Sequence, residues 1–192
     1  MSWVAGGEKL EINPEARRIA RGIKGPIGVL TVAGAYRTGK SYLLNRVLLN
    51  TQSGPGFGVG SSINPCTKGL WMWSAPIVGY SDKGEKMNII VVDSEGTGGL
   101  DEDQNHDMRI FSLALLLSSF FVYNSMGSID ENALSSLSFV TNISKHIKVK
   151  TAEGAGDGDS LERTPRRTTD AAEQELVQHM PKFLWVVRDF TL

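Results

Sequence analysis

The stretch GAYRTGKS, residues 34–41, is the strongest indication of the fold in this sequence. It fits the pattern G-x-x-x-x-G-K-[ST], in which glycines let the backbone curl around a phosphate while the lysine adds a point charge. An apolar, β-branched run precedes it at 27–33, and apolar residues at helical spacing follow over 43–48. A strand, a glycine-rich loop and a helix in this order are the context in which the pattern binds phosphate. We therefore predict a phosphate loop at the carboxyl end of a buried strand.

Strands and helices alternate along the rest of the chain. The helices are predicted at 104–118 and from Glu131 onward, where apolar residues mark one face of a third helix. Short apolar runs that predict strands occupy 70–76, 87–93, 120–125 and 182–187, the last of them buried. This alternation predicts an α/β fold of the P-loop NTPase class, with a mostly parallel central sheet flanked by helices.

Length and composition favour one globular domain, residues 1–192. The formal net charge of −1 is less basic than binding to long nucleic acid usually requires. A single cysteine excludes an internal disulfide framework, and the N-terminus has no apolar signal segment, so we expect a cytoplasmic protein. The polar, glycine-rich segment 148–172 predicts a flexible loop within the domain.

A second motif, Asp-Ser-Glu-Gly at 93–96, follows the predicted strand 87–93. An aspartate at a strand tip can hold Mg²⁺ through water, and the N–H of Gly96 can reach a terminal phosphate. The hydroxyl of Ser41 can ligate the same ion. Thr67 is the candidate that senses the γ-phosphate, with its hydroxyl on Mg²⁺, although it could instead merely begin the next strand. Thr97 follows Gly96, so the water-orienting glutamine of Ras-like proteins is missing here.

The base-recognition signal is weaker. The guanine-reading pattern N-K-x-D is absent, but Asp189 stands just past the final predicted strand, where such a motif would lie. A carboxylate there can accept from N1–H and N2–H₂ of guanine, whereas adenine offers an acceptor at N1 and repels it. This disfavours an ATPase. The alternative is that Arg188 and Asp189 form a surface ion pair of little consequence, and the residues alone leave both open.

Together, several blocks resemble the guanylate-binding proteins, a family of dynamin-related large GTPases. The blocks occur in the family's order from about residue 20 to the end of the chain, and they read GAYRTGKSYLLN, GFGVGSS, TKGLWMW, VVDSEGTGG, SSFFVYNSMGSID and FLWVVRDF. TKGLWMW, together with R-D in place of N-K-x-D, is typical of this group and its atlastin relatives.

The resemblance implies Mg²⁺-dependent hydrolysis of GTP to products such as GDP, coupled to homodimerisation through the GTPase face. It implies that Arg37 is a built-in arginine finger, a role worth ~10³–10⁵ in rate in GTPases generally. It gives Glu95 the task of organising the attacking water, the alternative being an exposed loop carboxylate. Catalysis would thus rest on Arg37, Thr67 and Glu95.

The remaining site residues also follow from the motifs and the resemblance. Arg188 and Asp189 would read guanine, and Ser41 and Thr67 would ligate Mg²⁺ with Asp93 close by. The residues expected at the nucleotide phosphates are Gly34, Arg37, Thr38, Gly39, Lys40, Ser41, Tyr42, Gly60, Ser61 and Gly96.

Two departures from the family pattern bear on activity. Pro65 stands where many guanylate-binding proteins carry a serine that serves a water relay, which suggests another relay or slow hydrolysis. The family's GTPase domain continues past the R-D pair, so we expect a GTPase domain incomplete at its C-terminus, with membrane contact only through regions absent from this chain. An atlastin-like membrane-fusion GTPase and a GTP-sensing interaction module with little hydrolysis remain as alternatives.

Overall fold

The computed structural model describes residues 4–6, 9–51, 56–59, 67–98, 104–127, 131, 134, 138 and 180–190. The chain divides into two compact units, one formed by 1–129 with 181–192 and the other by 130–180. The candidate site lies in the first unit. In the second, Glu131, Leu134 and Ser138 are helical, as predicted for the third helix. The rest of that helix and the predicted flexible loop 148–172 lie outside the described residues.

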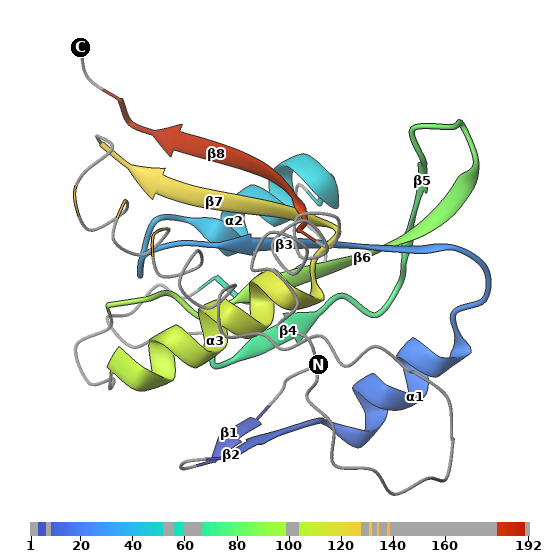
Figure 1. Cartoon of the computed structure of the whole chain (residues 1–192), viewed down its shortest axis with the longest axis horizontal. Coiled ribbons are helices and arrows are strands. Elements are labelled where there is room, and N and C mark those ends of the chain that lie inside the picture. The colour runs from blue at the N-terminus through green and yellow to red at the C-terminus, as the bar shows by residue number, and fades with distance from the viewer. Residues whose placement is uncertain are drawn as a thin grey trace, which may run out of the picture. The chain divides into compact units, whose positions relative to one another are not determined.

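A six-stranded sheet forms the centre of the first unit, in the order β4-β6-β3-β7-β8 with β5 paired to β6 (Figure 1). The neighbouring pairs β6–β3, β3–β7 and β7–β8 are parallel, whereas β4 and β5 run antiparallel to β6. The strands are β3 (Ile27–Ala33), β4 (Leu70–Met72), β5 (Ile77–Tyr80), β6 (Lys86–Ser94), β7 (Phe120–Met126) and β8 (Lys182–Arg188). The predicted α/β fold with a mostly parallel sheet is confirmed.

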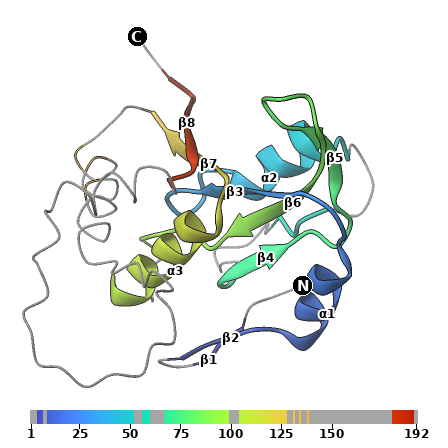
Figure 2. The ribbon, with the colours of Figure 1, turned by 45° about the vertical axis from the view of Figure 1, so that its right-hand side comes forward.

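Helices cover both faces of this sheet (Figure 2). Thr31 and Val32 are neighbours on β3, so their side chains point to opposite faces. Thr31 accepts a hydrogen bond from Ser118, just after α3 (Gln104–Leu117), at 2.7 Å. Val32 packs instead with Leu44, which follows α2 (Lys40–Leu43). The central strand is therefore buried on both sides, which explains its continuous apolar run.

The helix after the phosphate loop differs from a plain α-helix. Four residues of α2 pass into a π-helical turn, Leu44–Leu48, in which Leu49 N–H donates to the Leu44 carbonyl at 3.0 Å. Asn45 in this turn holds the following loop, since its amide accepts from Phe57 N–H at 2.7 Å and donates to the Phe57 carbonyl at 2.9 Å. Short π-helical turns occur frequently at functional sites, and this one fixes the loop at 56–59.

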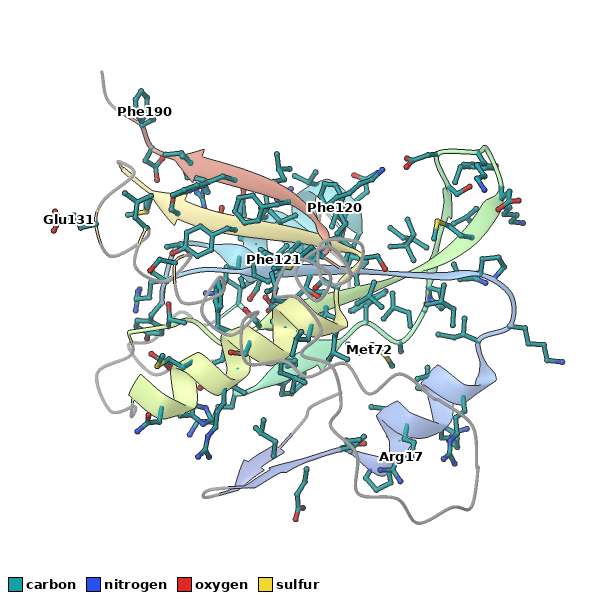
Figure 3. The ribbon with its side chains drawn as sticks, in the orientation of Figure 1. Arg17, Met72, Phe120, Phe121, Glu131 and Phe190 are labelled. Carbon is teal, nitrogen blue, oxygen red and sulfur yellow. The ribbon has the colours of Figure 1, made fainter. Side chains whose placement is uncertain are left out.

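The prediction that the last strand is buried was wrong. Phe183 and Leu184 on β8 are 47% and 46% exposed. Among the described strands β8 pairs with β7 alone and ends the strand order, so its side chains have fewer neighbours than those of β3. Figure 3 shows Phe121 on β7 inside the sheet and Phe190 beyond the end of β8, where it is exposed.

Four short elements were not predicted. They are β1 (Val4–Gly6), β2 (Lys9–Glu11), α1 (Pro14–Gly22) and β5. The start of α1 carries a recognisable signal, because Asn13 caps it by accepting from the N–H groups of Glu15 and Ala16. None of the described helices is long and apolar enough to cross a bilayer.

Candidate nucleotide site

The phosphate loop joins β3 to α2, and its conformation depends on glycine. Gly34 has φ 145° and Gly39 has φ 82°. A Cβ at Gly34 would overlap the backbone oxygen of Asn124, so no larger residue fits there. Arg37 also has a positive φ, 61°, which costs a non-glycine residue on the order of 1 kcal/mol or more. Two backbone hydrogen bonds connect the loop to the segment just after β6: Tyr36 N–H donates to the Thr97 carbonyl, and Thr97 N–H donates to the Gly34 carbonyl.

The three residues predicted to hold Mg²⁺ meet at one carboxylate. Asp93 Oδ2 accepts from the Ser41 hydroxyl at 2.6 Å and from the Thr67 hydroxyl at 3.2 Å. Thr67 lies three residues before β4 begins at Leu70, so the alternative that it merely starts a strand does not describe it. The structure thus brings together residues from α2, the loop before β4 and the end of β6.

The state of this carboxylate fits a cation site. Asp93 is fully buried, and burial raises its pKa, although the bond from Ser41, the charge of Lys40 and the bond from Thr67 oppose the rise. Its second oxygen, Oδ1, is buried and has no hydrogen-bond partner among the described residues. Hydroxyl and carboxylate oxygens are ligands that Mg²⁺ prefers. An ion here would supply a partner for Oδ1 and would add positive charge to that of Lys40 beside the buried carboxylate.

Lys40 is the second buried charge, with 7% of the residue exposed. Its ammonium donates to the Ala35 carbonyl of the phosphate loop at 2.9 Å. Loss of solvent lowers the pKa of Lys40 to about 8, even though the nearby Asp93 and Glu95 favour its charged form. A Cβ on Gly96 would lie 2.8 Å from this ammonium, so Gly96 is pressed against the loop. An anionic phosphate at this place would satisfy the lysine better than one carbonyl does.

Glu95 is buried, so the alternative of an exposed loop carboxylate was wrong. Only 4% of the residue is exposed. Oε2 accepts from Gly69 N–H at 2.6 Å and lies 3.2 Å from Nε2 of His106 on α3. His106 was not predicted as a site residue. The one indication in the sequence was that a histidine occurs early in the helix that follows the Asp-Ser-Glu-Gly motif.

Arg37 lies at the surface of the loop, in contrast to the buried Lys40. Its side chain is exposed, and its guanidinium carbon is 6.0 Å from the ring centre of Tyr36. Tyr42, 47% exposed, has the guanidinium carbons of Arg46 and Arg188 at 5.5 and 5.9 Å from its ring centre. The outer side of the loop therefore carries arginine and tyrosine side chains.

The two residues of the R-D pair at the end of β8 have different surroundings. Arg188 turns toward the phosphate loop, where Nη1 donates to the Thr38 carbonyl at 3.0 Å. Fully buried Asn124 on β7, another residue that sequence reasoning missed, donates to the same carbonyl at 2.8 Å. Asp189 is exposed with φ 50°. The described side chains of Arg188 and Asp189 form no ion pair, so that alternative does not apply.

Part of the predicted site cannot be placed. Gly60 and Ser61, expected beside the nucleotide, lie outside the described residues, as does Pro65. No group of three or more histidine, cysteine, aspartate or glutamate side chains clusters as a metal site within the described ranges. The cation site at Asp93 would therefore depend on hydroxyl oxygens as well as the carboxylate.

The chain is similar in sequence to proteins of one known family. The family model described as "Guanylate-binding protein, N-terminal domain" matches residues 7–192. The chain is 39% identical over 185 residues to human guanylate-binding protein 2, an alignment that covers 96% of this chain and 28% of that protein. Mouse guanylate-binding protein 3 is 40% identical over 185 residues, covering 96% of this chain and 27% of its own length. The chain belongs to the guanylate-binding protein family, and it spans about 28% of the length of the human relative.

Proposed function

We propose that this chain is a GTPase that binds GTP with Mg²⁺, hydrolyses it, and does so together with a second copy of itself. The observation that carries the proposal is the meeting of the Ser41 and Thr67 hydroxyls on the buried Asp93 carboxylate, beside the buried ammonium of Lys40. These groups lie at the carboxyl ends of parallel strands, where α/β proteins bind ligands. Membership of the guanylate-binding protein family supports guanine as the base.

The chain's own residues would bind and orient the triphosphate. Backbone N–H groups of the glycine-rich loop and the start of α2 would hold the phosphates, and Lys40 would move from the Ala35 carbonyl to a phosphate oxygen. Ser41 and Thr67 would hold Mg²⁺, with Asp93 beside it. When bound, that ion neutralises charge on the β- and γ-phosphate oxygens.

Hydrolysis would transfer the γ-phosphoryl group to water. The new bond forms between the water oxygen and the γ-phosphorus, the bond to the bridging oxygen breaks, and GDP leaves with that electron pair. Oε1 of Glu95, which is buried and has no hydrogen-bond partner among the described residues, would accept a hydrogen bond from the water. Asp189, exposed beyond β8, would accept the N1–H and N2–H₂ of guanine. The contact between Arg188 and the Thr38 carbonyl would then link the base end of the site to the phosphate loop.

Arg37 is the group that would connect hydrolysis to dimerisation. Its side chain is exposed in the single chain, whereas an arginine finger must reach the γ-phosphate in a site that excludes water. Docking of a second copy against the outer side of the loop would cover Arg37 and turn it inward. Turnover per molecule should therefore rise with protein concentration.

The test is nucleotide turnover by the purified chain at low and high concentration, with GTP or ATP and Mg²⁺. Arg37→Ala should leave GTP affinity within a few-fold and lower turnover by at least ~10-fold, as expected for a contact made in the transition state. Arg18→Ala is the matched control, because it removes an exposed guanidinium on α1, outside the loop and outside the group of side chains on its outer side.

Three outcomes would contradict the proposal. Equal turnover of ATP would remove the guanine assignment, and constant activity per molecule at all concentrations would remove the dimer. Binding of GTP with no turnover at any concentration would leave a GTP-sensing module in place of an enzyme.

A further inference from the structure

The carboxylate of Glu95 is held by two donors on one of its oxygens. Oε2 accepts from Gly69 N–H at 2.6 Å, and Nε2 of His106 lies 3.2 Å from the same atom. Oε1 is equally buried but has no partner among the described residues. A buried polar atom left without a partner costs about 1–3 kcal/mol, so its presence calls for an explanation.

The three residues come from segments that are separate in sequence. Gly69 lies two residues after Thr67, Glu95 follows β6, and His106 lies in the first turn of α3. Gly69 is bound at both of its backbone groups, because its carbonyl also accepts from Glu95 N–H at 2.8 Å. The position of the Glu95 carboxylate is therefore linked to the loop that carries Thr67.

The first turn of α3 is fixed to the same region by a second contact. Asp107, the residue after His106, accepts from Gly98 N–H at 2.6 Å. The loop that begins at Glu95 is thus attached to α3 at two consecutive residues. This places the imidazole of His106 against Oε2 from the side of the helix, while Gly69 approaches from the loop before β4.

We propose that His106 is a positioning residue for Glu95, fixing the rotation of the carboxylate so that Oε1 is the oxygen that receives the attacking water. This inference rests on the proposed GTP hydrolysis. The terminal torsion of a glutamate has a broad minimum, so one donor leaves the carboxylate free to rotate. A second donor on Oε2 restricts that rotation. Control of this kind matters because a displacement of about 1 Å can cost on the order of 100-fold in rate.

The experiment compares His106→Leu, which removes the donor, with His106→Gln, whose amide restores an N–H group at similar reach. His106→Leu should lower kcat for GTP by about 10–100-fold with KM unchanged, and His106→Gln should recover most of that loss. Amide hydrogen exchange at Gly69, measured by NMR without nucleotide, gives a second readout. It should become at least ~10-fold faster in His106→Leu, because the carboxylate would spend less time as its acceptor.

Met108→Leu is the matched control, since it places the same side chain two residues away on α3 without removing a hydrogen-bond donor. It should leave kcat and the exchange of Gly69 unchanged. Wild-type kcat and wild-type Gly69 exchange in His106→Leu would overturn the inference. So would an equal loss in the Leu and Gln variants, since packing of the ring would then matter and the donor would not. If the wild-type chain does not turn over GTP, the proposed function fails, and Gly69 exchange alone decides whether His106 positions Glu95.

Discussion

Replacing Lys40 by methionine should make the nucleotide-free protein more stable while it removes phosphate binding. The pKa of Lys40 falls from 10.5 to about 8, chiefly because burial removes water from the ammonium. The pKa difference of 2.5 (10.5 minus 8), at about 1.4 kcal/mol for each pKa unit, corresponds to about 3–4 kcal/mol by which the charged lysine destabilises the fold at neutral pH.

One loss reduces this gain. Methionine cannot donate to the Ala35 carbonyl, which costs about 1 kcal/mol. The attraction of Asp93 and Glu95 for the charged lysine is already contained in the lowered pKa, so it is not deducted again. We expect a net rise of about 2–3 kcal/mol in the free energy of unfolding at pH 7.

The stability difference between Lys40→Met and wild type should also depend on pH. Between pH 8 and 10.5 the unfolded chain binds more protons at Lys40 than the folded chain, so wild-type stability gains from Lys40 as pH rises through that window. The penalty is complete below pH 8 and absent above 10.5. Urea unfolding at pH 7 and pH 9.5 should therefore show a smaller difference between Lys40→Met and wild type at the higher pH. Lys83→Met, at an exposed lysine, is the control. A Lys40→Met variant that is less stable than wild type at pH 7, or a stability difference that does not shrink as the pH rises, would contradict this prediction.

Three further substitutions test separate parts of the fold. Gly34→Ala should abolish GTP binding measured by fluorescence titration, because its Cβ would overlap a backbone oxygen of β7; retained affinity would contradict the loop geometry. Asn45→Ala should lower the free energy of unfolding by about 1–3 kcal/mol in urea, since it removes both bonds to the Phe57 backbone. Asp82→Asn breaks an exposed ion pair with Lys182, whose hydrogen bond and charge lower the pKa of Asp82, and solvent screening should leave the thermal midpoint unchanged in calorimetry.

The sequence determined those parts of the protein that depend on neighbouring residues. The buried run at 27–33, the glycine pattern after it and the helix starting at Lys40 are local features, and each appeared as predicted. The Asp-Ser-Glu-Gly motif at 93–96 could be placed for the same reason, because it follows the short apolar run 87–93 that was predicted as a strand. Family motifs then supplied candidate roles for these residues.

The tertiary structure decided what depends on contacts between distant segments. The order of strands in the sheet cannot be deduced from any single segment of sequence. This order left β8 exposed and paired β5 with β6. The same order brought Arg188 to the carbonyl of Thr38, 150 residues earlier in the chain, and set His106 beside Glu95. A side chain's burial and its hydrogen-bond partner follow from which strands and helices become neighbours. The periodicity of apolar residues identifies a helix or strand and the face that it buries. Which residues this face contacts depends on the free energy of the whole packed sheet.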